Sequence, residues 1–231
     1  MLYSQYYEEI LYPLQDKVLK MLKNCDLPFY LTGGTAVSRG YFGHRYSDDL
    51  DFFVNGDSDF QEHIEKVLKI FDDSDLKVDY ADVSTATFMR IFINRNIGGL
   101  DENGLKVDFV NDIDVHFGEI HNTEVYYRTD SLRNILSNKY TALYRIAVKD
   151  VVDICEIAKN LSFSWADIID EASQKEGGID LKEVIQIFRS FDDVAFKNVK
   201  WAKKTNIDQL KENMNIIAAD MLNERSNSLC G

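Results

Sequence analysis

The chain has 231 residues, 45% of them hydrophobic and 28% charged, a balance that is typical of globular proteins and excludes a wholly disordered chain. It has 39 acids and 26 bases, a formal net charge of −13, which argues against a protein that binds nucleic acid mainly through a basic face. The sequence lacks an apolar run of membrane-spanning length, a signal-peptide pattern at its start and paired cysteines, so we expect a cytoplasmic protein with no membrane partner.

Helices and strands alternate in the N-terminal part. Apolar residues at helical spacing predict helices over 3–24 and 60–71. Short apolar or alternating runs predict strands at 29–31, 50–54, 76–82, 86–94 and 105–110, a short helix over 35–41, and turns at Gly98-Gly99 and Asn103-Gly104.

The C-terminal part has a different character, because helical periodicity replaces strand-like runs after about residue 130. Helices are predicted over 131–147, 150–160, 164–173, 180–190 and 206–223. We therefore predict an α+β fold in two domains. A core of mixed sheet with flanking helices spans 1–128, and an all-α helical bundle spans 129–231.

Gly33-Gly34-Thr35 lies between a predicted buried strand and the short helix, with Thr35 expected near the helix N-cap. Glycines allow the backbone to approach a ligand closely, and free N–H groups at a helix start favour anions such as phosphate. A glycine pair alone is more often a simple turn, so this feature needs support from its neighbours.

Asp49-Leu50-Asp51 opens the predicted strand over 50–54. Side chains alternate along a strand, so Asp49 and Asp51 should share one face. Two such carboxylates repel each other unless a cation lies between them, and oxygen ligands suit Mg²⁺ or Mn²⁺. The alternative is a solvated strand end, and Asp48 shows that further acids are tolerated there.

Asp108 is the acid on the polar face of an otherwise apolar strand at 105–110. If this strand is a neighbour of the strand that carries Asp49 and Asp51, three carboxylates converge; otherwise Asp108 faces water at an edge. Three converging acids beside a phosphate-binding glycine turn indicate a two-metal site for nucleotidyl transfer.

These segments resemble a known family. LTGGTAV at 31–37 and GHRYSDDLDFF at 43–53 are similar to the signature of the AbiEii/AbiGii toxin nucleotidyltransferases, which belong to the DNA polymerase beta-like nucleotidyltransferase superfamily. KVD at 106–108, KYTALYR at 139–145 and KDVVD at 149–153 extend the resemblance into the helical part. It implies a polymerase-beta-like core followed by a helical bundle.

The resemblance also implies roles for site residues. Gly33, Gly34 and Thr35 would hold phosphate, Asp49 and Asp51 would bind Mg²⁺ or Mn²⁺, and Asp108 would be the third catalytic and metal-binding acid. Arg45 and Ser47 would clamp the triphosphate or brace the loop before the paired aspartates. For Arg45, an ion pair with Asp48 or Asp49 is the structural alternative.

Two further roles fall in the helical part. Lys139 would reach the nucleotide phosphates, with an exposed helix lysine as the alternative. Asp150 would be the acid of the last family motif, and its alternatives are a helix N-cap or a partner of Arg145. Asp153 follows one helical turn later.

The function implied is the transfer of a nucleoside monophosphate from an NTP to an acceptor hydroxyl. The chain would be the toxin of a type IV toxin–antitoxin or abortive-infection system, with an antitoxin protein as partner and RNA, such as tRNA, or protein as acceptor. Five bases against one acid in 126–149 leave room for a polyanion there. The alternatives are a small-molecule, antibiotic-type nucleotidyltransferase and a non-catalytic NTP-binding regulatory module.

Overall fold

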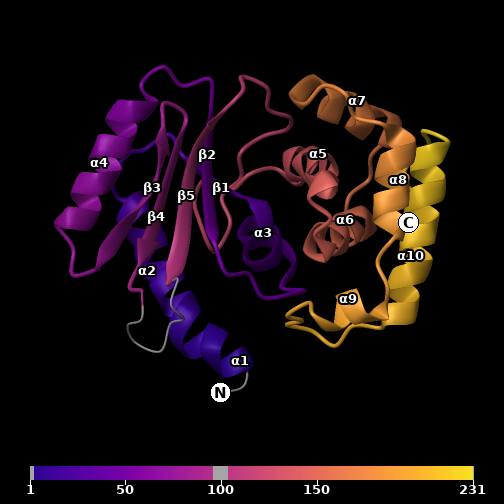
Figure 1. Cartoon of the computed structure of the whole chain (residues 1–231), viewed down its shortest axis with the longest axis horizontal. Helices are drawn as coiled ribbons and strands as arrows, with labels where there is room; N and C mark the ends of the chain where they lie inside the picture. Colours follow the sequence, from indigo (N-terminus) through magenta and orange to yellow (C-terminus); the bar gives the residue numbers. More distant parts are fainter. Residues whose placement is uncertain (1–2, 96–103, 231) are drawn as a thin grey trace. The chain divides into compact units, whose positions relative to one another are not determined.

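We describe residues 3–95 and 104–230 of a computed structural model (Figure 1). The predicted turn at Gly98-Gly99 lies outside these residues, as does Asn103 of the second predicted turn. Five strands form one sheet in the order β1-β2-β5-β4-β3. Strands β2 and β5 are parallel and the other neighbours are antiparallel, so the sheet is mixed as predicted. The strands are β1 (Tyr30–Thr32), β2 (Leu50–Asn55), β3 (Val78–Thr85), β4 (Phe88–Ile93) and β5 (Leu105–Asp112).

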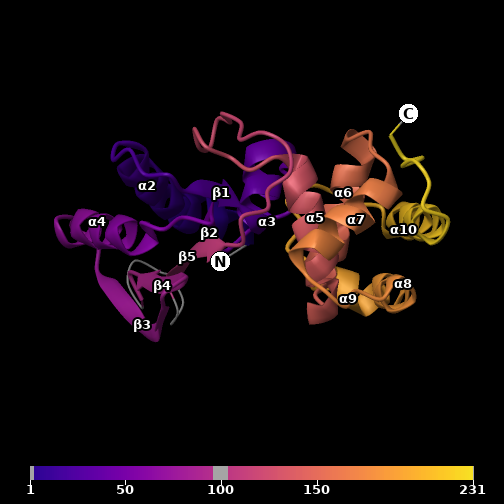
Figure 2. The same ribbon diagram turned by 90° about the horizontal axis from the view of Figure 1, so that it is seen from above.

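The sheet has one apolar face because apolar residues occupy alternate positions in its central strands. Leu50 and Phe52 of β2 and Val107 and Phe109 of β5 are fully buried on that face. Helices α2 (Tyr12–Lys23) and α4 (Phe60–Asp72) lie together over it (Figure 2). The opposite face is left to the polar residues of the same strands.

Two helical regions in the N-terminal part of the chain are irregular. The predicted helix over 3–24 is present as α1 (Tyr3–Tyr6), a π-helical segment (Tyr7–Leu11) and α2. The short helix after β1 begins with α3 (Gly33–Thr35) and continues as a π-helical segment (Ala36–Phe42).

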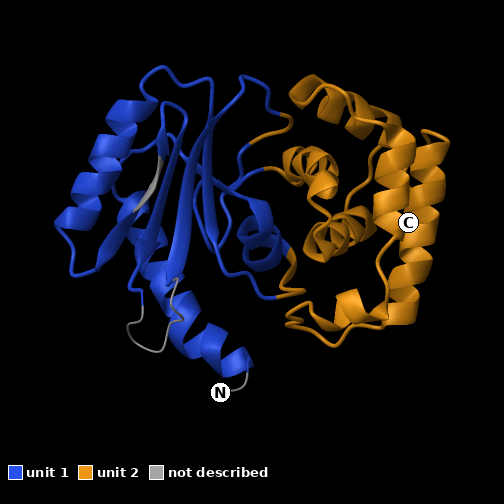
Figure 3. Ribbon diagram, in the orientation of Figure 1, with its two compact units in different colours: residues 1–41, 46–116, 120–130 blue, residues 42–45, 117–119, 131–231 orange. Residues whose placement is uncertain are grey.

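The chain divides into two compact units (Figure 3). Unit 1 contains residues 1–41, 46–116 and 120–130, and unit 2 contains 42–45, 117–119 and 131–231. The sequence-based division placed all residues before 129 in one domain. The structure assigns two short internal segments, 42–45 and 117–119, to the helical unit.

Unit 2 is helical, which confirms the predicted α+β class with an all-α C-terminal part. Its α-helices are α5 (Leu132–Thr141), α6 (Val148–Asn160), α7 (Trp165–Lys175), α8 (Leu181–Arg189), α9 (Asp193–Lys197) and α10 (Ile207–Leu222), with a 3-10 turn (Ala142–Arg145) after α5. Periodicity missed α9, which is shorter than two helical turns and is capped by Asp192. Within the described part of the chain, no helix combines the length and apolarity that crossing a membrane requires.

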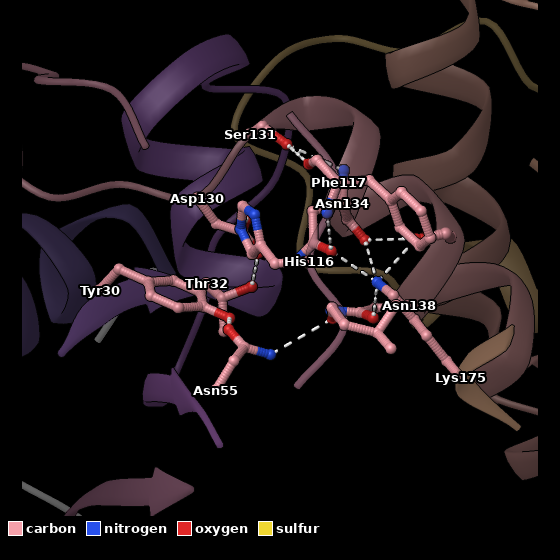
Figure 4. A network of polar contacts seen from close by, with 12 residues as sticks. Tyr30, Thr32, Asn55, His116, Phe117, Asp130, Ser131, Asn134, Asn138 and Lys175 are labelled. Atoms are coloured by element: carbon pink, nitrogen blue, oxygen red, sulfur yellow. Dashed lines mark hydrogen bonds and ion pairs between the residues drawn. The ribbon is translucent and has the colours of Figure 1, made fainter. Parts of the chain in front are cut away.

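Lys175 joins two helices of unit 2 (Figure 4). Its ammonium donates to Oδ1 of Asn134 at 2.6 Å, to Oδ1 of Asn138 at 2.6 Å and to Oγ of Ser137 at 2.8 Å. One cation at the end of α7 therefore satisfies three side chains of α5, which fixes the packing of these helices against each other.

Candidate active site

Strand register brings the predicted carboxylates together in unit 1. Asp51 of β2 lies directly beside Asp108 of β5, so both side chains project from the same face of the sheet. On the outer sides of this pair, Thr32 of β1 lies beside Asp51, and Arg90 of β4 lies beside Asp108. Asp49, two residues before Asp51, belongs to the same polar face. The alternation of apolar and polar residues predicted this polar face, and the parallel pairing of β2 with β5 brings Asp51 close to Asp108.

Two cations also lie on this face, and sequence reasoning missed both. Arg90 makes a bidentate pair with Asp108, with Nε 2.7 Å from Oδ1 and a terminal nitrogen 2.8 Å from Oδ2. Lys106 places Nζ 2.9 Å from Oδ2 of Asp49 and 3.5 Å from Oδ2 of Asp108. Alternation along 105–110 could have indicated Lys106, whereas Arg90 depends on a strand pairing that the sequence does not reveal.

The electrostatic environment stabilises both cations in their charged forms. Partial burial disfavours the charged ammonium of Lys106, but the nearby carboxylates of Asp49 and Asp108 outweigh this, so its pKa is raised. Hydrogen bonding to Asp108 raises the pKa of Arg90 despite some desolvation. The carboxylate face is therefore a mixed-charge surface.

The glycine turn lies against this face. Gly33 has φ +67°, and a Cβ added there would lie 2.5 Å from Oδ2 of Asp51. The prediction that Thr35 lies near the N-cap is wrong, because the helix begins at Gly33 after an extended Thr32. Thr35 instead donates its hydroxyl to the carbonyl oxygen of Asp49 at 2.5 Å, which ties the glycine turn to the start of β2.

We expect Gly33→Ala to reduce strongly the nucleotidyl transfer that the sequence implies. The new methyl group would strain a left-handed backbone by about 1–2 kcal/mol and would displace the Asp51 carboxylate. Gly177→Ala is the matched control, because Gly177 does not have a positive φ and nothing lies within 4 Å of its added Cβ. Transfer rates and thermal midpoints of both variants would be measured, and equal rates would contradict the proposed contact.

Ser47 and Asp48 are anchored to the N-terminal helical segments. Ser47 is buried; its N–H donates to the hydroxyl of Tyr12 at 3.3 Å and its carbonyl accepts from Nε2 of Gln15 at 3.1 Å. Asp48 is exposed and accepts a hydrogen bond from the hydroxyl of Tyr7. These contacts brace the loop that leads into β2.

A second polar cluster of unit 1 includes a histidine that sequence reasoning did not assign to the site (Figure 4). Asp130 is fully buried and accepts from the Thr32 hydroxyl at 2.5 Å, while Nε2 of His116 lies 2.9 Å from its other oxygen. The ring of Tyr30 meets the His116 ring edge-to-face, with 5.3 Å between centroids. Because Thr32 is the register neighbour of Asp51, this cluster fixes the β1 side of the carboxylate face.

The remaining predicted residues form a buried ion network in unit 2. Arg45 binds Asp153 through two nitrogens, with Nε 2.7 Å from Oδ1 and a terminal nitrogen 2.6 Å from Oδ2. Nε2 of His44 also lies 2.9 Å from Oδ1 of Asp153. The alternative that Arg45 pairs with Asp48 or Asp49 is therefore wrong.

Lys139 closes the network between two acids of α6. Its Nζ lies 2.6 Å from Oδ1 of Asp150 and 2.8 Å from Oδ2 of Asp153. With 7% of its side chain exposed, it is not the exposed helix lysine of the alternative interpretation. Asp150 is not an N-cap, since Ala147 occupies that position, but it does accept from Arg145 at 3.0 Å.

Charge compensation keeps this buried network ionised. Burial disfavours the charged forms of Lys139 and Asp153, and their mutual attraction more than offsets it. The pKa of Lys139 is therefore raised, and the pKa of Asp153 is held well below its usual range, with Arg45 contributing. Arg145 is the member that reaches solvent, with 63% of its side chain exposed.

The basic stretch 126–149 does not form one continuous basic surface. Lys139 is buried and Arg133 forms an ion pair with Glu171, whereas Arg145 pairs with Asp150 and is exposed. Its exposed positive charge is therefore smaller than the sequence count suggested.

A metal fits only part of the predicted carboxylate set. Among the described residues, no group of three or more His, Cys, Asp or Glu side chains is arranged to hold a metal ion. Asp49 and Asp51 provide the hard oxygen donors that Mg²⁺ or Mn²⁺ prefers, whereas Asp108 is occupied by Arg90 and Lys106. A glycine turn packed on an Asp-x-Asp strand, beside a parallel strand with a third acid, agrees with the nucleotidyltransferase site that the sequence resemblance implied.

Comparison with known proteins identifies the family. The model of the AbiEii nucleotidyltransferase toxins of type IV toxin–antitoxin systems matches residues 19–227. The chain therefore belongs to the AbiEii nucleotidyltransferase family, which confirms the predicted resemblance and the enzyme class. Nucleotidyltransferases of this kind use an NTP and a divalent metal ion, and a type IV system implies an antitoxin partner.

Solved structures show the same fold at low sequence identity. JHP933 from Helicobacter pylori is 19% identical, with a TM-score of 0.58 over 90% of this chain and 89% of that chain. MenT4, a nucleotidyltransferase toxin from Mycobacterium tuberculosis, is 12% identical, with a TM-score of 0.53 over 90% and 92%. No curated protein matches the sequence.

Proposed function

We propose that the chain transfers a nucleoside monophosphate from an NTP to an acceptor hydroxyl, with Mg²⁺ or Mn²⁺ held by Asp49 and Asp51. The observation that carries this proposal is the close approach of Gly33 to the Asp51 carboxylate on a face shared with Asp108. A bound divalent ion would neutralise charge on the triphosphate and the leaving pyrophosphate.

The protein's own groups bind and orient the nucleotide in this proposal. Backbone N–H groups of Gly33 and Gly34 donate to phosphate oxygens, since no Cβ obstructs their approach. Thr35 holds the carbonyl of Asp49 and so sets the position of the Asp-x-Asp strand relative to the glycine turn. Ser47 contributes by holding the preceding loop through its backbone contacts.

Within unit 2, we propose that Arg45, Lys139 and Asp150 take part in nucleotide binding through Arg145. Both acids of the network are buried and paired, so the exposed Arg145 guanidinium is the group available to a phosphate. Arg45 and Lys139 then act as positioning residues, because Arg45 binds Asp153 and Lys139 holds Asp153 together with Asp150, the acid that pairs with Arg145.

We propose RNA as the acceptor and an antitoxin protein as the partner. Exposed lysines at 197, 203 and 204 are near Trp201 in the sequence of unit 2, and such cations attract the phosphates of an RNA. The indole of Trp201 donates to the carbonyl of Phe196 at 3.0 Å, so its polar edge is used within the protein.

Incubation of the protein with each α-labelled NTP, Mg²⁺, and total RNA or total protein tests this function. We expect Mg²⁺-dependent label in the RNA fraction, released by ribonuclease and unaffected by protease. Label in the protein fraction would mean that the acceptor is a protein, and the proposed transfer reaction would stand. Label confined to small molecules would favour the antibiotic-type alternative, and NTP binding without transfer to any acceptor would favour the regulatory module.

A further inference from the structure

We infer that Lys106 and Arg90 are built-in counter-ions that take the place of a second metal ion, and that Asp108 holds these cations instead of coordinating metal. The site then takes one divalent ion, at Asp49 and Asp51. This inference rests on the proposed function and specifies how its metal site differs from the two-metal arrangement that three acids indicated.

Charge balance on the polar face supports one ion. Asp49, Asp51 and Asp108 alone carry −3, a charge that suits two divalent ions. Arg90 and Lys106 reduce the charge of the five side chains to −1, which suits one divalent ion together with the charge of an incoming triphosphate. A second ion would add positive charge to an environment that is already compensated.

The contacts of Asp108 are those of a saturated carboxylate. Both of its oxygens accept charge-assisted hydrogen bonds from Arg90, and Oδ2 also meets Lys106. With 8% of its side chain exposed, Asp108 is largely shielded from water, whereas Asp49 is 29% exposed. A metal at Asp108 would have to displace a bidentate guanidinium from a carboxylate that is largely shielded from water.

The cations are held by regular strands, so they are part of the fold. Arg90 is the direct cross-strand neighbour of Asp108 in the antiparallel pairing of β4 with β5. Lys106 lies two residues before Asp108 on β5, and its side chain projects from the same face. Opposite-charge pairs directly across a sheet stabilise it, so both cations also strengthen the strand pairing.

Lys106 contacts both Asp49, the proposed metal ligand, and Asp108, which binds no metal in this inference. Its ammonium contacts Asp49 through Oδ2, one of two oxygens of that carboxylate, and a carboxylate can use its other oxygen for a metal. The ammonium therefore places a fixed positive charge between Asp49 and Asp108.

Titration of the purified chain with Mn²⁺ alone, followed by electron paramagnetic resonance of the free ion, tests the inference. We expect one Mn²⁺ per wild-type chain and one for Asp108→Asn, with dissociation constants within about threefold. Asp51→Asn should lose the ion. The double variant Arg90→Met/Lys106→Met should gain a second binding event, because removal of both cations leaves Asp49 and Asp108 as adjacent uncompensated acids.

Two outcomes would overturn the inference. In the first, the wild type binds two Mn²⁺ ions and Asp108→Asn binds one. In the second, Asp108→Asn weakens the affinity for Mn²⁺ by about tenfold or more, the range expected when groups that support a metal are removed. Circular dichroism confirms that each variant is folded, and the double variant that lacks both cations provides an answer if Asp108→Asn is not folded. If the wild type binds two ions and still transfers label from the NTP, only the inference is refuted. If it neither transfers label nor binds Mn²⁺, the proposed function is refuted as well.

Discussion

Asp51→Asn is expected to abolish Mg²⁺-dependent transfer of label, with a loss well beyond a hundredfold. Asp51 lies both against the glycine turn and beside Asp108, so its carboxylate is central to the proposed metal and phosphate site. Even groups that only support metal ligands cost about 10- to 100-fold when removed. An asparagine keeps the size and shape of the side chain, so the expected loss reflects charge and metal binding.

Asp48→Asn is the matched control for this variant. Asp48 is three residues away and exposed, and it accepts a hydrogen bond from Tyr7 that an asparagine oxygen can also accept. Initial rates with saturating NTP and a Mg²⁺ series should separate the two variants clearly. Full activity of Asp51→Asn at low Mg²⁺ would exclude Asp51 as a metal ligand.

Asp153→Ala is expected to destabilise the protein by about 3–5 kcal/mol, the range measured when one partner of a buried ion pair is removed. Asp153 is fully buried and accepts from Arg45, His44 and Lys139. Its removal leaves two cations without their shared counter-ion. Urea denaturation followed by circular dichroism measures the change in the free energy of unfolding.

The destabilisation caused by Asp153→Ala should become smaller at acidic pH. The pKa of Asp153 is lowered in the folded protein, so its stabilisation is fully present above the unfolded pKa of about 3.9 and is lost as pH falls below it. The difference between wild type and Asp153→Ala should therefore be constant from about pH 5 to 7 and shrink under more acidic conditions. Asp193→Asn, which removes an exposed acid paired with Lys211, should leave the midpoint nearly unchanged.

Much of the fold could be predicted because local patterns determined it. The apolar alternation of 50–54 and 105–110 identified β2 and β5, and it also placed the aspartates on the polar faces of these strands. Helical spacing likewise located α4 and α6 to within two residues. Gly33-Gly34 and the two aspartates were identified as a site because glycine flexibility and carboxylate repulsion are properties of the residues themselves.

What the sequence could not reveal depends on pairing between distant segments. Arg90 became part of the site through the register of β4 on β5, and no local pattern encodes that register. The partner of Arg45 is 108 residues away, so local reasoning offered only the nearest acids, Asp48 and Asp49, as alternative partners for it. The short helix at 193–197 was missed because five residues carry too little periodicity.

The division of the chain has a consequence for any attempt to separate the units. Residues 42–45 belong to the helical unit although they lie in sequence between parts of unit 1, and the chain passes between the two units five times. A fragment that ends at residue 130 would keep Arg45 and discard Asp153, which carries its compensating charge. Neither unit is a continuous piece of polypeptide, so no single cut in the chain separates the two units.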